Sequence, residues 1–98
     1  MIRHIVLWKL KDKPNKAANA VRIKQLLEGL RGRIPGLLKI EVGIDFSDTD
    51  HSADVVLLSE FTDRDALDVY QGHPLHAAMK PEIGALTAER RVVDHTID

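Results

Sequence analysis

Two segments of this chain strongly favour β-structure and leave no polar face. Residues 2–10 contain four consecutive apolar side chains that begin at Ile5, and residues 54–61 contain four more that begin at Val55. Side chains alternate across a strand, so each run places apolar residues on both faces of its strand. Strands of this kind lie inside a sheet whose two faces are both covered. The pattern therefore predicts two central strands, each of which needs cover on both sides.

Between these two runs, the spacing of apolar residues predicts a helix and a strand that are each buried on one side only. Apolar and polar residues alternate over residues 38–46, so that Leu38, Phe46 and the apolar residues between them share one face of a half-buried strand. Apolar residues recur at spacings of three and four over residues 16–33, which predicts a helix with one apolar side. Asn15 stands just before this helix and is its expected N-cap.

The second half of the chain predicts a broken helix and a last strand. Thr62 is the expected N-cap of a helix that runs to about Tyr70. Pro74 suits the first position of a further helical segment, which runs to about Lys80. Residues 88–97 complete the pattern with a final strand.

The order of these elements, β-α-β-β-α-β, is typical of a ferredoxin-like α+β fold in one domain over residues 1–98. In this fold the sheet has four antiparallel strands, the first and third strands are central, and both helices lie on one face. The other face of the central strands then has no cover within the chain. A second copy is the simplest cover, so we expect a homodimer formed through the sheet faces. The alternative is that this face is only mildly apolar and meets solvent.

The composition limits the partners and the location. The chain has 14 basic and 15 acidic residues with no basic stripe, so nucleic-acid binding is not expected. Its uncharged apolar runs are far shorter than the roughly 20 residues that cross a membrane. There is no cysteine, so no disulfide supports the fold. We expect a cytoplasmic protein that binds neither nucleic acid nor membrane.

Candidate chemistry is densest around the predicted helix break. Tyr70, His73 and His76 lie within seven residues. A Tyr can donate a proton and a His titrates near neutral pH, so the group could polarise a carbonyl and move a proton beside it. The structural alternative is that His73 caps the turn at Pro74 and that Tyr70 belongs to the core. His4 is a further candidate, because it would approach Tyr70 and His76 if its face of the first strand looks toward the helices.

Metal binding has weaker support. His73 and His76 are three residues apart, but a catalytic zinc site needs a third ligand and none is evident. The acidic residues within residues 48–54 are typical of a solvated turn. The sequence also lacks a phosphate-binding loop or nucleotide fingerprint. We therefore expect no metal and no cofactor.

Several of these segments together resemble the stress-responsive A/B barrel, or Dabb, family. The resemblance covers nearly the whole chain and rests on residues 4–10, the turn at residues 34–37, the strand–helix junction at residues 57–65, and residues 70–76. It implies ferredoxin-like protomers that pair through their sheets into a dimeric α/β barrel.

The resemblance also implies a site. The family includes plant stress proteins and olivetolic acid cyclase, a plant enzyme in which a Tyr and a His six residues later act in a cavity between sheet and helices. That pair corresponds to Tyr70 and His76 as catalytic residues, and two cavity histidines correspond to His4 and His73 as substrate-binding residues. A further cavity His of the cyclase is replaced here by Asp54, and its aromatic alkyl pocket has no evident counterpart.

Two functions stay open on the sequence. One is a protein that binds a small apolar or carbonyl-containing ligand, or a cofactor-independent enzyme of the cyclase, isomerase or lyase type that abstracts a proton beside a carbonyl. The other is a non-catalytic, stress-responsive structural dimer. Other dimeric α/β barrels handle quinones or haem, but no residue of this chain specifically supports such a role.

Overall fold

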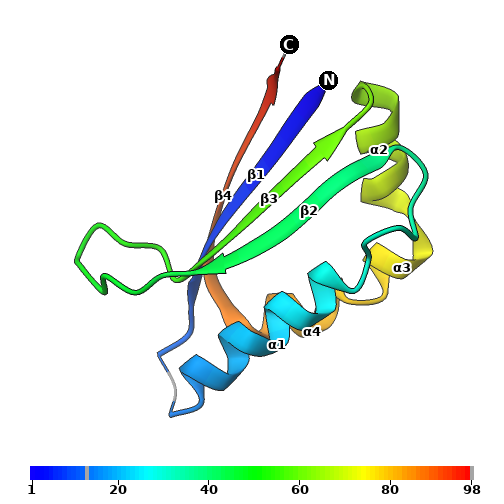
Figure 1. Ribbon diagram of the computed structural model, residues 1–98. Helices are drawn as coiled ribbons and strands as arrows, with labels where there is room; N and C mark the ends of the chain where they lie inside the picture. The colour runs from blue at the N-terminus through cyan, green and yellow to red at the C-terminus, as the bar shows by residue number, and fades with distance from the viewer. Residues whose placement is uncertain (13, 98) are drawn as a thin grey trace.

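The fold has one sheet and one layer of helices. The computed structural model describes residues 1–12 and 14–97. Its elements are β1 (Ile2–Leu10), α1 (Lys16–Glu28), β2 (Leu37–Ile44), β3 (Val55–Phe61), α2 (Arg64–Gly72), α3 (Pro74–Ala77), α4 (Lys80–Leu86) and β4 (Thr87–Thr96). The strands form one antiparallel sheet in the order β2-β3-β1-β4, and the helices lie on one side of it (Figure 1). The predicted ferredoxin-like α+β fold, with the first and third strands in the middle, is confirmed.

The two central strands divide their side chains between the two faces of the sheet. The even-numbered residues of β1 and the odd-numbered residues of β3 are buried, and they form one core with α1 and α2. The alternate residues of both strands point away from the helices. We call this second surface the open face, and its apolar members are Ile5, Leu7, Val56, Leu58 and Val93.

The predicted apolar face of the second strand is only partly correct. Ile40 and Val42 are buried, but Leu38 is 54% exposed and Phe46 is 97% exposed. The pairing of β2 with β3 shifts register between Leu37 and Lys39, which breaks the alternation before Ile40. Phe46 lies beyond the end of β2, in the loop that projects away from the sheet (Figure 1).

One predicted N-cap is confirmed in its position, and the other is wrong. Asn15 occupies the N-cap position of α1, but its side chain makes no capping hydrogen bond. The cap of α2 is Asp63, whose carboxylate accepts a hydrogen bond from the Ala66 amide at 2.8 Å. Thr62 lies one residue before the cap, and its amide donates to Gly36 O at 3.1 Å, which extends the pairing beyond β3.

The predicted end of the second helical segment is also wrong. Lys80 does not end a helix but begins α4, which continues to Leu86. Pro81 does not stop it, because the proline lies in the first turn, where a helix does not use the backbone amide. α4 brings Lys80 and Ile83 over the sheet.

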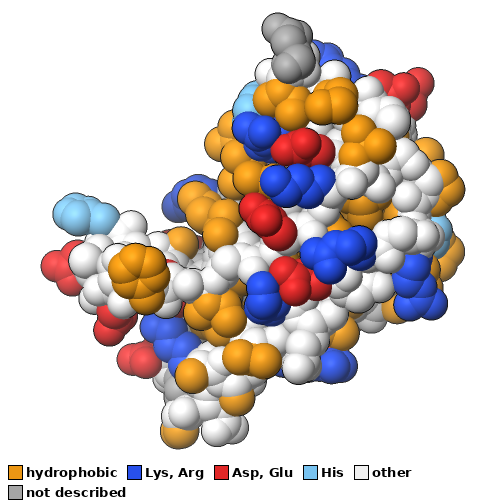
Figure 2. Space-filling view, viewed as in Figure 1, with side chains coloured by type: hydrophobic (Ala, Val, Ile, Leu, Met, Phe, Trp, Pro, Cys, Tyr) orange, Lys and Arg blue, Asp and Glu red, His pale blue; other side chains and the backbone are white. Residues whose placement is uncertain are grey.

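The surface has no concentrated charge of one sign in the view of Figure 2. Basic and acidic side chains are interleaved there, with hydrophobic side chains beside them (Figure 2). Ion pairs join Arg3 to Glu60 at 3.0 Å and Arg22 to Glu82 at 2.6 Å. Within the described residues, no helix is both long and apolar enough to cross a membrane.

The turn before β2 lies close against α2. Gly36 has a φ of +80°, and a Cβ built on it would lie 2.5 Å from the Cβ of Ala66 in α2. Gly32 has a similar φ of +75° but has nothing within 4 Å of a built Cβ. Both positions favour glycine for its backbone freedom, whereas only Gly36 also needs its lack of a side chain.

We predict that Gly36→Ala destabilises the protein more than Gly32→Ala does. Each substitution forces an L residue into the left-handed region, at about 1–2 kcal/mol. Gly36→Ala must also push α2 away, which adds roughly 1–3 kcal/mol. Urea unfolding followed by circular dichroism measures both. Equal losses for the two variants would show that the close approach of α2 does not matter.

Candidate functional site

A pocket of about 390 Å³ lies between the sheet and the helices. Its apolar wall consists of Val6, Trp8, Leu27, Leu57 and Ile83. Its polar lining consists of His4, Gln71, His76, Lys80, Thr87 and Arg90. This volume falls within the range of small-molecule sites, which combine apolar walls with a few polar groups.

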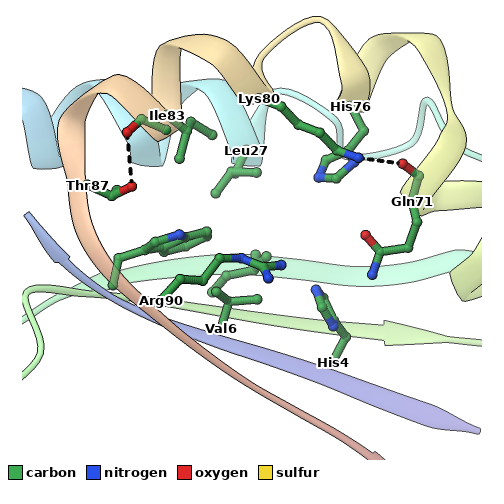
Figure 3. A pocket seen from close by; sticks show the side chains of 12 residues that line it. His4, Val6, Leu27, Gln71, His76, Lys80, Ile83, Thr87 and Arg90 are labelled. Carbon is green, nitrogen blue, oxygen red and sulfur yellow. Dashed lines mark hydrogen bonds between the residues drawn. The ribbon is translucent and has the colours of Figure 1, made fainter.

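The polar groups approach the pocket from two sides. His4 rises from β1 on the floor, and the guanidinium of Arg90 extends from β4 over the same floor (Figure 3). His76 and Lys80 enter from the helical layer opposite (Figure 3). A molecule in the pocket would therefore meet groups from the sheet on one side and groups from α3 and α4 on the other.

His4 is held by a carboxylate. The β1–β4 ladder pairs His4 directly with Asp94, and His4 Nδ1 lies 2.5 Å from Asp94 Oδ1. His4 is 2% exposed, while the Asp94 side chain is 42% exposed. An ionised carboxylate can only accept a hydrogen bond, so Nδ1 of His4 donates, and in the neutral ring Nε2 is the acceptor. Asp94 therefore fixes the tautomer and the orientation of the His4 ring.

His76 lies against the ring of Tyr70. Their ring centroids are 4.2 Å apart with an interplanar angle of 30°, which is a tilted stack rather than a hydrogen bond. Nδ1 of His76 is buried and has no hydrogen-bond partner among the described residues. The stack fixes the ring while leaving this nitrogen available.

Burial keeps His76 uncharged. Loss of solvent lowers the pKa of His76 to about 4, and the positive charges of Lys80 and Arg90 act in the same direction. The backbone of Gln71 opposes this shift without reversing it. At neutral pH the ring is therefore a neutral imidazole, with one nitrogen that donates and one that accepts.

Tyr70 is a core residue behind the pocket wall. It is 0% exposed and packs against Phe61, with centroids 5.1 Å apart, and against His4, at 6.1 Å. Burial raises the pKa of Tyr70, although the charge of Arg90 opposes the shift, so the phenol stays protonated. Its hydroxyl is buried and has no hydrogen-bond partner among the described residues. Its contacts with the site are through the rings of His76 and His4.

His73 is the N-cap of α3. Its Nδ1 accepts a hydrogen bond from the Leu75 amide at 3.1 Å, and Pro74 follows it in the first turn. His73 is not among the residues that line the pocket. The structure thus brings together His4, Tyr70 and His76, and it gives His73 the capping role that the sequence left as an alternative.

Asp54 lies away from this pocket, beside the start of α1. It accepts a hydrogen bond from the Leu10 amide at 2.7 Å and pairs with Lys16 at 3.1 Å. Burial alone would raise the pKa of Asp54, but these two partners outweigh it and lower the pKa. Within residues 1–12 and 14–97, no cluster of three or more potential metal ligands occurs.

Three polar groups of the site carry no recognisable signal in the sequence. Asp94 reaches His4 only through the register of β4 on β1. Arg90 is an alternating residue of an edge strand, and Lys80 starts a short helix that the sequence did not predict. Charged residues are common in edge strands and short helices. That these three side chains meet at one pocket became clear only from the pairing of the strands.

This arrangement defines a ferredoxin-like protomer with a pocket between its sheet and its helices. Residues 2–97 match the Stress responsive A/B Barrel Domain, Dabb, and the chain belongs to this family. A search of curated proteins finds no match.

Solved structures support the same fold. A dimeric ferredoxin-like protein of unknown function from Bacteroides fragilis is 31% identical, with a TM-score of 0.88 and coverage of 98% of this chain and 95% of that chain. A similar dimeric protein from Thermobifida fusca is 26% identical, with a TM-score of 0.81 and coverage of 98% and 90%. A Dabb family protein from Mesorhizobium loti, 20% identical with a TM-score of 0.74, shares the fold over 98% of this chain and 95% of its own.

We predict that His76 makes the protein less stable as the pH falls from 6.5 to 4. In the unfolded chain His76 takes up a proton below its ordinary pKa of 6.5, whereas in the folded protein it does so only near 4. The unfolded state then binds more protons, so stability is lost across this window, by on the order of 1–3 kcal/mol. We expect a loss near the lower end of this range, because solvent that enters the pocket screens the charge of a protonated His76.

Urea unfolding at a series of pH values measures this loss. His76→Gln should flatten the profile between pH 6.5 and 4, whereas His51→Gln, in an exposed loop, should leave it unchanged. A profile that keeps its slope in His76→Gln would show that the ring is not held in its neutral form by burial.

Proposed function

We propose that this protein is a homodimer whose protomers pair through their open faces. Leu7 lies in a central strand and is nevertheless 42% exposed, and its ladder neighbour Val56 is on the same face. The related proteins from Bacteroides fragilis and Thermobifida fusca are described as dimeric. Pairing of two such faces would cover apolar residues that a monomer leaves to water.

We predict that Leu7→Arg converts the dimer to a monomer. The substitution places a charge at the centre of the proposed interface, where it has no partner and loses its water. Val21→Arg is the matched control, because Val21 is 45% exposed on α1, in the helical layer. Sedimentation velocity should show a dimer for the native chain and for Val21→Arg. A monomeric native chain, or a dimeric Leu7→Arg variant, would contradict the interface.

We further propose that the pocket binds a small carbonyl compound and removes a proton beside its carbonyl group. The observation that carries this proposal is the position of the His4–Asp94 pair opposite the neutral His76, across a pocket of about 390 Å³. Nε2 of His4 takes the proton from carbon, and the electrons of the broken C–H bond move onto the carbonyl oxygen. The ring N–H of His76 donates to that oxygen, a role that a neutral imidazole can fill.

The other residues predicted for the site, Tyr70 and His73, then hold His76 in place. Tyr70 holds the ring of His76 through the stack at 4.2 Å, and His73 holds the first turn of α3, on which His76 lies. Neither needs to contact the substrate in this proposal. Enolisation of this kind precedes isomerisation or ring closure by carbon–carbon bond formation.

We predict that the protein accelerates exchange of the protons beside the carbonyl in at least one member of a panel of small ketones in D₂O. A positioned general base supplies about 10²–10⁴-fold in rate. His4→Gln should abolish the acceleration, while His95→Gln, a half-buried residue on β4 that does not line the pocket, should retain it. Proton NMR follows the loss of signal. An unaccelerated panel, or full activity in His4→Gln, would contradict the proposed chemistry.

A second candidate function is a non-catalytic stress-responsive dimer. Tyr70 favours it, because a fully buried Tyr packed against Phe61 and His76 contributes to the core whether or not a ligand binds. In that case no small molecule would raise the melting temperature. A ligand that raises it in the native protein but not in His4→Gln would exclude this function.

A further inference from the structure

Two permanent positive charges face the pocket, and among residues 1–12 and 14–97 no acidic side chain lines it. Arg90 and Lys80 are both part of the lining, whose other polar members are two histidines, a glutamine and a threonine. His76 adds no charge to the pocket, because its ring is neutral. The pocket therefore carries a positive charge that its own lining does not balance.

Within the described part of the chain, Arg90 is not engaged in an ion pair, unlike Arg3 and Arg22. Arg3 and Arg22 are each paired with a glutamate. Among the described residues, Arg90 has no carboxylate within salt-bridge distance. Lys80 uses one of its donors on the Gln71 carbonyl at 2.9 Å and retains two others. Both cations can thus serve a bound anion without breaking an existing ion pair.

We propose that the ligand of this pocket is a small carboxylate with an apolar body, and that Arg90 binds its carboxylate from the sheet side while Lys80 faces it from the helical layer. This inference rests on the proposed function of the pocket as a small-molecule site. A planar guanidinium matches a carboxylate in a two-bond geometry, which favours a carboxylate over a neutral oxygen. Trp8, Leu27 and Ile83 provide apolar surface for the rest of the molecule.

The pKa of His76 should report whether a bound ligand is charged. Lys80 and Arg90 help to lower the pKa of His76, so a bound anion between them should raise it again. A neutral molecule in the pocket would displace water without adding a negative charge. It would leave the pKa of His76 low or lower it further.

The test uses two probes of the same shape and different charge, 3-phenylpropanoate and 3-phenylpropanamide. Calorimetry measures their affinities, and NMR follows the histidine resonances of the pocket. We expect the carboxylate to bind at least about tenfold more tightly than the amide, as hydrogen bonds to charged groups are worth this much. Bound carboxylate should raise the pKa of His76, and the amide should not.

Substitution of the cation assigns the effect to one residue. Arg90→Gln should weaken 3-phenylpropanoate binding about tenfold and leave the amide unchanged. Arg33→Gln, at an exposed position outside the pocket lining, should weaken neither probe. If Arg90→Gln does not fold, the comparison of the two probes on the native protein still decides the question.

The outcomes separate this inference from the proposed function. Equal binding of acid and amide, or carboxylate binding that survives Arg90→Gln in full, overturns the carboxylate inference while a small-molecule pocket remains. Failure of 3-phenylpropanoate to shift the His4 and His76 resonances also overturns the inference, while the exchange experiment with ketones decides the small-molecule function separately.

Discussion

The two central strands impose a requirement that the rest of the structure must meet. β1 and β3 alternate between buried residues that face the helices and apolar residues that face away from them. The helical layer covers the first set and forms the core with it. The same alternation that builds the core therefore also produces an open face, because a strand cannot be apolar in a continuous run and remain polar on one side.

The helix-facing side of the sheet serves the fold and the site together. His4 occupies a core position of β1, where Asp94 of the edge strand gives its buried ring nitrogen a partner. The break between α2 and α3 lets His76 turn toward it, and Tyr70 fills the space behind. The cost of this arrangement is a histidine that cannot take up a proton near neutral pH, and that neutral ring suits proton transfer beside a carbonyl.

Much of the fold could be predicted, because it depends on local patterns. The period of apolar residues was enough for the order of the elements and for the central position of β1 and β3. The shift at Leu37–Lys39 and the cap at Asp63 were missed, since each depends on how β2 and β3 meet rather than on the local sequence. The grouping of His4 with Tyr70 and His76 was expected only on the condition that the His4 face of β1 looks toward the helices, and the structure meets this condition.

The polar partners of the site were missed for a related reason. Asp94 and Arg90 gain their places from the pairing of the first and last strands, which lie about as far apart in the chain as two elements can. His73, in contrast, was identified but could not be assigned one role. A His before Pro can cap a helix or belong to a site, and its hydrogen bond to the Leu75 amide shows that it is a cap. Such ambiguities are resolved by hydrogen bonds, which the structure provides.

The central claim is that one face of the sheet forms the pocket and the other binds a second copy. Paramagnetic relaxation of methyl groups by a soluble gadolinium chelate tests it directly, because Leu7 and Val21 are almost equally exposed in the single protomer, at 42% and 45%. The account predicts strong relaxation at Val21 and little at Leu7. Equal relaxation of the two methyl groups would show that the open face is in water and would contradict it.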